Sequence, residues 1–369
     1  MSAQRRLRSG GRGPGSWLLS LCCLAAIGVA AVPADPPFSP DKARLLIYRD
    51  AEGKEHPVKN ADDWAQRRAH ILANMQLVMG PLPDASHKVA LDVKVAEEVK
   101  KKKYVRQKLT FAAEKGDRVP AYLLIPLEGD GKRPAVLCLH QTNGKLGKDE
   151  PVGLGGAANL HYAHELAERG YVTLAPDYPS FGEYPFDFGK SAFPSGSLKA
   201  VWNNLRAIDL LQSLPEVDGE RLGCIGHSLG GHNAMFTAAF DPRIRALVSS
   251  CGFTSFPKYF SGNLKGWTSA RYMPLIASKY EAKPEKVPFD FPEVVAAFAP
   301  RAFLACAPVR DSNFEVSGVK DCIAAAQPVY ELLGAREKLA ALHPDCGHDF
   351  PPEVRQAAYE WLDRWLKKN

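Results

Sequence analysis

The residues that most clearly point to chemistry surround Ser228, in the stretch Gly-His-Ser-Leu-Gly at positions 226–230. A serine hydroxyl is a poor nucleophile unless the backbone exposes it beside a base, as a sharp strand-to-helix turn does. That turn leaves no room for side chains two residues before and two residues after the serine, and Gly226 and Gly230 meet this condition. The pattern therefore predicts a nucleophile at Ser228 and an oxyanion donor at the amide of Leu229.

The segments on either side supply the context that this motif requires. Residues 221–225 are a short apolar run that indicates a buried strand. Residues 232–240 indicate a helix that ends before Pro242, and residues 244–251 indicate another apolar strand. The sequence thus predicts a strand–turn–helix–strand unit with Ser228 at the first turn.

A serine nucleophile in this context needs an acid and then a histidine, each in a loop after a later strand. Residues 301–309 indicate one such strand, with Asp311 just beyond its end. Residues 338–342 indicate the next, and the loop after it contains His348. We therefore assign Asp311 as the acid and His348 as the base.

Three other residues could fill these two roles. Glu315 and Asp321 also follow the first of these strands, but each lies farther from its end. His343 ends the second strand itself, whereas Gly347 gives the backbone at His348 more freedom to turn. An acid after the preceding strand is not expected, because residues 251–279 contain no Asp or Glu.

A second oxyanion donor is expected in the loop after an earlier strand. Residues 134–139 indicate that strand, and His-Gln-Thr-Asn-Gly follows it. The amide of Thr142 is our first choice and that of Gln141 the second. The alternative is an ordinary strand-to-helix loop without a catalytic role.

The beginning of the chain predicts a signal peptide over residues 1–34. Four arginines precede an apolar stretch at residues 17–32, and small residues allow cleavage after Ala31 or Ala34. The stretch is too short to indicate a membrane span, so we expect a secreted or periplasmic protein without a stable membrane span. The formal charge of +6 falls to +2 without the four arginines, which gives no reason to expect a nucleic-acid partner.

The cysteines and histidines do not predict a metal site. Four of the six cysteines after the signal peptide lie in apolar strand patterns, where a free thiol acts as a small hydrophobic group. Cys322 and Cys346 are expected nearer the surface, where they could form a disulfide. His161 and His164 share a predicted helix face but have no third ligand nearby in the sequence, so a solvated face is favoured. We expect neither a metal nor an organic cofactor.

From Tyr104 onward, strands alternate with amphipathic helices, which predicts a mostly parallel sheet covered on both faces. We expect an N-terminal extension at residues 35–103, with a helix at about residues 61–79 plus a strand, and a catalytic domain at residues 104–369. Residues 253–292 interrupt the alternation and predict a lid-like insertion. Aromatic side chains in this insertion and in the loop at residues 178–188 are candidate substrate-binding groups, namely Tyr184, Trp267 and Tyr272.

Together these motifs resemble the α/β-hydrolase superfamily over roughly residues 104–366. The resemblance rests on the glycine-flanked serine, on Asp-Tyr-Pro-Ser-Phe-Gly at 177–182, on Ala-Pro-Arg at 299–301 leading to Asp311, and on Gly-His-Asp-Phe at 347–350. Within the superfamily, the chain is similar to the dienelactone-hydrolase and acetyl-xylan-esterase-like group of exported bacterial proteins. The resemblance implies an eight-stranded sheet flanked by helices, an N-terminal helical extension and an insertion before the seventh strand.

These observations predict a secreted serine hydrolase that cleaves carboxylic esters, including acyl esters of carbohydrates, through an acyl-enzyme. The expected partner is a small-molecule or oligosaccharide ester. One alternative is a serine peptidase like prolyl oligopeptidase, although about 70 residues before Tyr104 cannot form the large propeller domain of that class. The other is a hydrolase fold kept as a non-catalytic binding module.

Overall fold

The computed structural model describes residues 36–129 and 131–367. The predicted signal peptide at residues 1–34 and its cleavage site lie outside the described residues. Residues 36–369 belong to one unit by their contacts. Within the described part of the chain, no helix is both long enough and apolar enough to cross a membrane.

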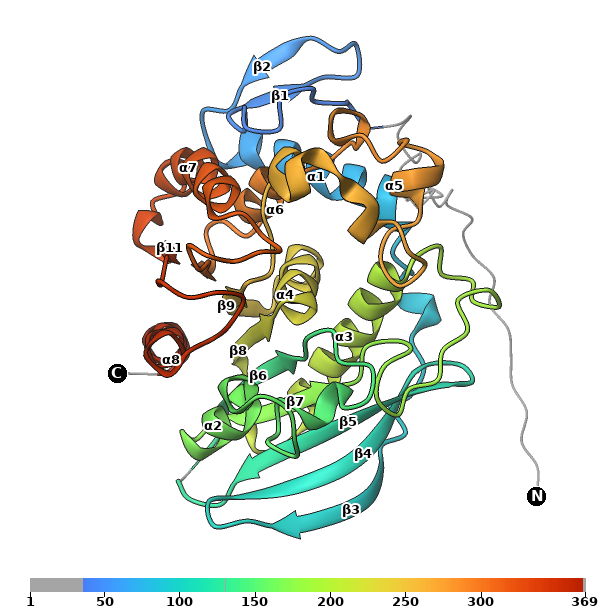
Figure 1. Cartoon of the computed structure of the whole chain (residues 1–369), viewed down its shortest axis with the longest axis vertical. Helices are drawn as coiled ribbons and strands as arrows, with labels where there is room; N and C mark the ends of the chain where they lie inside the picture. Colours follow the sequence, from blue (N-terminus) through green and yellow to red (C-terminus); the bar gives the residue numbers. More distant parts are fainter. Residues whose placement is uncertain (1–35, 130, 368–369) are drawn as a thin grey trace, which may run out of the picture. The chain divides into compact units, whose positions relative to one another are not determined.

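A nine-stranded mixed sheet forms the centre of the fold (Figure 1). Its order is β11-β10-β9-β8-β6-β7-β5-β4-β3, and the five pairings from β11 to β7 are parallel. The strands are β3 (Lys94–Lys100), β4 (Tyr104–Glu114), β5 (Asp117–Pro126), β6 (Arg133–Leu139), β7 (Val172–Pro176), β8 (Val217–His227), β9 (Ile244–Ser250), β10 (Ala302–Cys306) and β11 (Leu339–Leu342). The mostly parallel sheet predicted from the sequence is therefore confirmed.

The sheet has one strand more than the eight expected. The additional strand is β3, which pairs antiparallel with β4 and forms one edge. It comes from the N-terminal extension at residues 35–103. A strand was expected there, but the sequence did not indicate that it joins the central sheet. Charged, exposed side chains dominate β3, as is usual for an edge strand that must not pair with other chains.

Helices cover both faces of the sheet. The helices are α1 (Ala61–Met79), α2 (Tyr162–Glu168), α3 (Gly196–Ser213), α4 (Leu229–Phe240), α5 (Leu275–Ser278), α6 (Phe291–Ala296), α7 (Val316–Leu332) and α8 (Pro352–Leu366). The apolar sides of α1, α3, α4, α6 and α7 enter one large core. The apolar sides of α2 and α8 form a second core on the opposite face. Each face of the sheet thus has its own hydrophobic layer, as expected for parallel strands.

The segment before the sheet is joined to the larger core. A two-stranded sheet of β1 (Ile47–Arg49) and β2 (Glu55–Pro57) precedes α1. The side chain of Asn60 caps α1 by accepting hydrogen bonds from two backbone N–H groups of its first turn. Arg67 on α1 forms a buried ion pair with Glu293 on α6, with 2.5 Å between Nη2 and Oε1. This pair links α1 to the segment that precedes β10.

The segment between β9 and β10 contains the expected insertion (yellow to orange in Figure 1). It is built from short elements, η4 (Phe256–Gly262), η5 (Leu264–Trp267), α5 and η6 (Pro284–Lys286), and then α6. Many of its aromatic side chains are buried in the larger core, including Phe256, Trp267 and Phe291. These rings attach the insertion to the larger core.

One expectation about the cysteines is wrong. Cys322 was expected near the surface, where it could pair with Cys346, but its side chain lies on the buried side of α7 with 0% exposure. Both thiols are free. Cys322 lies three residues after Val319 and four before Ala326, so all three side chains share the buried side of the helix.

Candidate active site

Ser228 occupies a sharp turn between the last residue of β8 and the first residue of α4. Its backbone has φ 55° and ψ −117°, a conformation that residues with a Cβ rarely adopt. A Cβ on Gly226 would lie 2.2 Å from the carbonyl oxygen of Gly230, and a Cβ on Gly230 would lie 1.9 Å from the carbonyl oxygen of Leu139. Both positions therefore require glycine, as the sequence pattern predicted.

Hydrogen bonds hold the backbone of Ser228 in this strained form. Its N–H donates to the carbonyl oxygen of Ser250 at 2.8 Å, and its own carbonyl oxygen accepts from Gly231 and His232 at 2.9 Å and 3.2 Å. Leu229 is the first residue of α4, where N–H groups have no partner within the helix. The Leu229 amide thus lies beside the serine at the positive end of a helix dipole.

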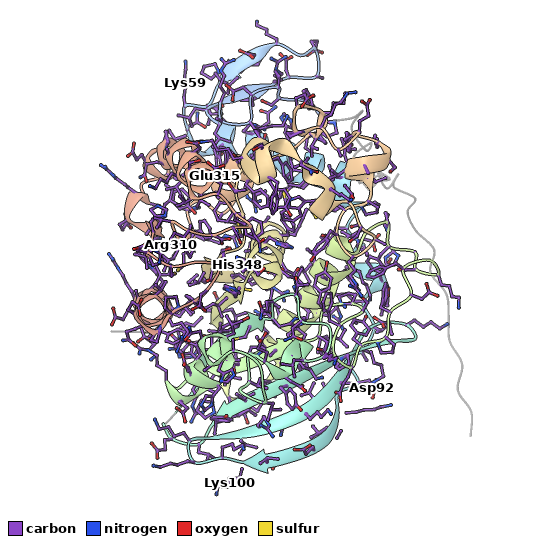
Figure 2. All side chains as sticks on the ribbon, viewed as in Figure 1. Lys59, Asp92, Lys100, Arg310, Glu315 and His348 are labelled. Carbon is purple, nitrogen blue, oxygen red and sulfur yellow. The ribbon has the colours of Figure 1, made fainter. Side chains whose placement is uncertain are left out.

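Asp311 and His348 form a direct pair across two loops. Figure 2 labels His348 near the middle of the molecule. Nδ1 of His348 lies 3.0 Å from Oδ1 and 2.9 Å from Oδ2 of Asp311. The Asp311 side chain is 1% exposed and that of His348 is 19% exposed. Oδ1 also accepts from the backbone N–H groups of Asn313 and Phe314, at 2.8 Å and 3.1 Å. These bonds fix the orientation of the carboxylate.

The electrostatics of this pair favour a charged aspartate. Burial raises the pKa of Asp311, but the His348 ring and the two backbone N–H donors stabilise the carboxylate more strongly, so its pKa lies below the ordinary value. A charged carboxylate accepts the Nδ1 proton, which leaves Nε2 of His348 as the basic nitrogen. The arrangement is suited to a base that accepts a proton from a neighbouring hydroxyl.

The alternative acids and base have other partners. Glu315 is exposed, and its carboxylate accepts from the hydroxyl of Ser317. Asp321 forms an ion pair with Lys258 at 3.0 Å. Nδ1 of His343 lies 3.0 Å from the carbonyl oxygen of Ala307. Among the predicted acids and bases, the structure brings together Asp311 and His348.

His227, the residue before the serine, packs against His348. Their ring centroids are 4.9 Å apart, with an edge-to-face arrangement. Burial and, to a smaller extent, the nearby His348 lower the pKa of His227 to about 3, so the ring is neutral near pH 7. Because consecutive residues lie side by side, this contact brings the His348 ring to the turn that carries Ser228.

The loop after β6 brings Thr142, rather than Gln141, to the cavity in front of Ser228. The side chain of Gln141 turns away and donates to Glu150 at 2.9 Å. His140 anchors the loop, since its Nδ1 lies 2.6 Å from the carbonyl oxygen of Gln141 and its Nε2 accepts from the N–H of Tyr178 at 2.9 Å. These two contacts leave the buried His140 ring neutral, and burial lowers its pKa.

The cavity beside Ser228 has a volume of about 210 Å³. Two of the three predicted substrate-binding residues, Trp267 and Tyr272, line it. Tyr184 lies elsewhere: it is buried, and its hydroxyl donates to Asp117 at 2.5 Å beside the buried ammonium of Lys199. The aromatic spacing of that loop could not reveal this, because Asp117 lies 67 residues away in the sequence.

Several residues that line the cavity were not predicted. They are His232, Tyr259, Phe260, Gly266, Asn313 and Phe314. His232 follows Ser228 by one turn of α4, so its place on the same side of the helix could have been inferred. Burial lowers the pKa of His232 to about 3, and its ring packs against Trp267 with 4.7 Å between centroids.

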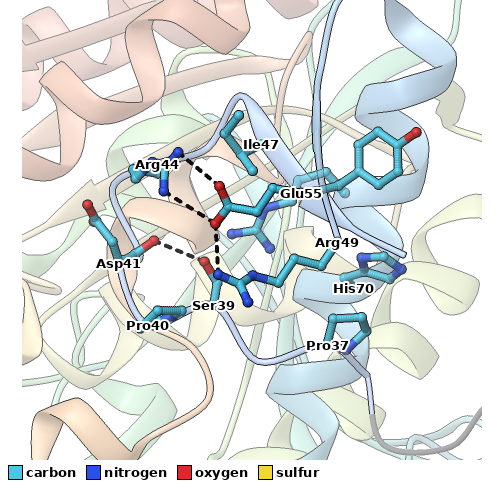
Figure 3. A pocket seen from close by; sticks show the side chains of 11 residues that line it. Pro37, Ser39, Pro40, Asp41, Arg44, Ile47, Arg49, Glu55 and His70 are labelled. Carbon is cyan, nitrogen blue, oxygen red and sulfur yellow. Dashed lines mark hydrogen bonds and ion pairs between the residues drawn. The ribbon is translucent and has the colours of Figure 1, made fainter. Parts of the chain in front are cut away.

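A second hollow lies near the N-terminal segment, between residues such as Pro37, Arg44 and His70 (Figure 3). Its volume is about 20 Å³, which is enough for roughly one water molecule. Glu55 bridges Arg44 and Arg49 at its rim, at 3.2 Å and 2.7 Å. This hollow is too small for a substrate, whereas the cavity at Ser228 is about ten times larger and contains the predicted nucleophile.

One group of side chains among the described residues has ligand atoms close enough to hold a metal ion, namely His227, Cys251 and His348, within 4.8 Å of one another. Nδ1 of His348 already pairs with Asp311. Burial raises the pKa of the Cys251 thiol, which disfavours the thiolate that binds metals. The chemistry of this donor set therefore fits proton transfer better than metal binding.

Solved structures with a similar arrangement of strands and helices include esterases. A glucuronoyl esterase from Solibacter usitatus superposes with a TM-score of 0.69 at 20% identity, covering 90% of this chain and 97% of that chain. Acetyl xylan esterase 1 from Thermoanaerobacterium sp. JW/SL YS485 superposes with a TM-score of 0.58 at 18% identity, covering 82% and 94%. The chain has the α/β-hydrolase fold. The fold class predicted from the sequence is thus confirmed.

Sequence comparisons agree with this fold. The chain is 27% identical over 313 residues to YtaP of Bacillus subtilis strain 168, whose name describes it as a hydrolase, and the match covers 82% of this chain and 99% of YtaP. The family model for fungal glucuronyl esterases matches residues 186–334. That stretch includes Ser228 and Asp311 but ends before His348.

Proposed function

We propose that this protein is a serine hydrolase that cleaves carboxylic esters through Ser228, His348 and Asp311. One observation carries the proposal: the strained turn at Ser228 and the bonded Asp311–His348 pair follow the carboxyl ends of parallel strands in a single sheet. Active sites of open α/β sheets lie at that edge. The cavity that Ser228 lines can accept a substrate there.

In the proposed mechanism, His348 takes the Ser228 proton as the hydroxyl oxygen attacks the ester carbonyl. The amides of Leu229 and Thr142 donate to the oxyanion that forms. His348 then gives its proton to the departing alcohol, and the acyl group stays on Ser228. Water, deprotonated by His348, attacks the acyl-enzyme and releases the acid. Asp311 keeps Nδ1 protonated and stabilises the imidazolium in both half-reactions.

The proposed substrates are esters of carbohydrates. Glucuronoyl and acetyl xylan esterases have the same fold, and the fungal glucuronyl esterase model matches the stretch that contains Trp267 and Tyr272. Both side chains line the cavity beside Ser228. Aromatic rings are suited to the apolar face of a sugar.

We further propose that the protein is secreted after removal of residues 1–34. The arginine-rich, apolar character of those residues supports export. Export suits an enzyme whose substrates are polymers or oligosaccharides outside the cell.

The first test replaces the nucleophile. Ser228→Ala should reduce hydrolysis of a short-chain nitrophenyl ester to background, because general-base catalysis contributes roughly 10²–10⁴ in rate and cannot act without the hydroxyl. A fluorophosphonate probe should label the wild-type protein at Ser228 and should not label the variant. Wild-type turnover by folded Ser228→Ala would refute the assignment.

A substrate screen then separates the remaining functions. It compares methyl esters of uronic acids, acetylated oligosaccharides, feruloyl esters and proline-containing peptides. Cleavage of the peptides but none of the esters would favour a peptidase. A folded protein that neither reacts with the probe nor cleaves any substrate would favour a binding module. Hydrolysis of one carbohydrate ester class well above the aryl esters supports the proposal and identifies the acyl group.

A further inference from the structure

Phe260 lies at the mouth of the Ser228 cavity with an exposed ring. Its side chain is 54% exposed, more than any other large hydrophobic residue in the described ranges. Exposed single hydrophobic residues are common on protein surfaces and need no explanation by themselves. Phe260 differs because it also lines the cavity that contains Ser228 and Leu229.

The backbone that presents this ring is strained. Phe260 has φ 43° and ψ 46°, and Ser261 has φ 56° and ψ 38°, so two consecutive residues with a Cβ adopt the left-handed conformation. The N–H of Tyr259 donates to the carbonyl oxygen of Ser255 at 3.0 Å, and the N–H of Asn263 donates to that of Phe260 at 3.2 Å. The surrounding hydrogen bonds thus fix a conformation that costs free energy and that holds the ring out of the core.

A continuous row of rings connects Phe260 to the catalytic histidine. Phe260 meets Tyr259 edge to face, with 4.8 Å between centroids. Tyr259 packs on Phe314 at 5.8 Å, and Phe314 packs on the ring of His348 at 6.0 Å. Phe314, Tyr259 and Phe260 therefore form an aromatic wall of the cavity, and Phe314 joins this wall to the His348 ring.

This wall flanks the part of the substrate that leaves first. In the proposed mechanism, His348 must lie beside the alcohol oxygen in order to protonate it. Thr142 and Leu229 hold the carbonyl oxygen instead, and the Thr142 hydroxyl lies 3.3 Å from that of Tyr272. In the cavity lining, Trp267 stands between Tyr272 and Tyr259, with ring centroids 6.1 Å and 5.7 Å away. The alcohol group of an ester bound at Ser228 therefore extends along the aromatic wall toward Phe260.

We propose that Phe260 is a binding platform for a ring in the alcohol part of the ester, an inference that rests on the proposed function. The matching chemistry is a flat apolar face, which either a phenyl ring or the C–H face of a pyranose supplies. Acyl transfer to Ser228 then releases a ring-bearing alcohol, protonated by His348. The acyl part does not contact the platform.

The test varies the alcohol while the acid stays the same. It measures kcat/KM for the methyl, benzyl and glucopyranosyl (through the C6 hydroxyl) esters of one acid with the wild-type protein, Phe260→Ala and Phe260→Trp. Phe260→Ala should lower kcat/KM by between about 2-fold and about 12-fold for the ring-bearing esters and leave the methyl ester unchanged. Phe260→Trp should retain the preference, because it keeps a flat ring. All three esters give the same acyl-enzyme. Where deacylation limits turnover, kcat should therefore be the same for the wild-type protein and the Phe260 variants.

Each outcome decides between readings. A loss with only the benzyl ester identifies an aryl alcohol, and a loss with only the glucopyranosyl ester identifies a sugar alcohol. Equal losses of kcat/KM with all three esters would refute the proposal that Phe260 is a binding platform. Unchanged kcat/KM with both ring-bearing esters would also refute it. Phe38→Ala, which removes another exposed ring that lies under Lys42, is the matched control and should change none of the rates. Loss of all turnover in Ser228→Ala would keep the esterase assignment intact even if the platform failed.

Discussion

Replacing Asp311 with Asn should reverse the hydrogen bonding of His348 while the shape of the side chain is kept. Oδ1 accepts from the N–H groups of Asn313 and Phe314, and Oδ2 lies 2.9 Å from Nδ1 of His348. The amide oxygen of Asn must take the Oδ1 position, because both backbone groups are donors. The amide nitrogen then faces Nδ1, and it can only donate a hydrogen bond.

The consequence is that His348 carries its proton on the wrong ring nitrogen. An amide N–H at the Oδ2 position, 2.9 Å from Nδ1, opposes a proton on Nδ1, whereas the amide oxygen at the Oδ1 position lies 3.0 Å away and accepts from two backbone N–H groups already. The balance favours the tautomer with its proton on Nε2, the nitrogen that should accept the Ser228 proton. The same exchange of Asp for Asn in a serine protease lowers kcat by roughly 10⁴, equivalent to about 5 kcal/mol of transition-state stabilisation. We expect a comparable loss for Asp311→Asn, with KM changed much less.

The assay is kcat for a nitrophenyl ester across the pH range, with far-ultraviolet circular dichroism to confirm folding. The pKa of Asp311 is lowered, so this group should remain charged and should not cause the acidic decline of wild-type activity. Glu315→Gln and Asp321→Asn serve as controls, because both carboxylates lie on the same segment but contact other groups. A folded Asp311→Asn protein with more than about a tenth of wild-type kcat would refute this reasoning.

Three further changes test other parts of the structure. Gly230→Ala places a Cβ 1.9 Å from the carbonyl oxygen of Leu139, so the turn at Ser228 must move. We expect kcat to fall on the order of 10²-fold, and circular dichroism should show that the variant still folds. Arg67→Met leaves Glu293 buried without its ion-pair partner, so the free energy of unfolding, measured in urea, should fall by about 3–5 kcal/mol. The double variant with Arg67→Met and Glu293→Met should recover most of this loss. Burial raises the pKa of Asp290 to about 7, so its native carboxyl retains a proton that the unfolded chain loses near its ordinary pKa of 3.8. The stability contribution of Asp290 is therefore present at low pH and is lost as the pH rises toward about 7. The difference in unfolding free energy between wild type and Asp290→Asn should change between the ordinary pKa of 3.8 and about 7. A difference that stays constant over this pH range would contradict the raised pKa of Asp290.

Local patterns in the sequence were enough to predict the elements that position the site. Apolar runs of five to nine residues predicted parallel strands, and the helix expected at about residues 61–79 spans Ala61–Met79. The glycines around Ser228 predicted the turn, because a sharp strand-to-helix turn leaves no room for side chains at these two positions. The atoms that exclude them are the carbonyl oxygen of Gly230 at Gly226 and that of Leu139, on the neighbouring strand, at Gly230. The pairing of Asp311 with His348 could also be inferred, since loops that follow neighbouring parallel strands meet at one edge of the sheet.

Only the tertiary structure decided what each side chain meets. The sequence treated Tyr184 and Tyr272 alike, yet Tyr184 bonds to Asp117 and Tyr272 lies beside Thr142 in the cavity. The physical reason is the range of the interactions. Periodicity reports which side of a residue's own helix or strand is apolar, whereas these contacts join segments 67 to 130 residues apart and depend on how the layers pack.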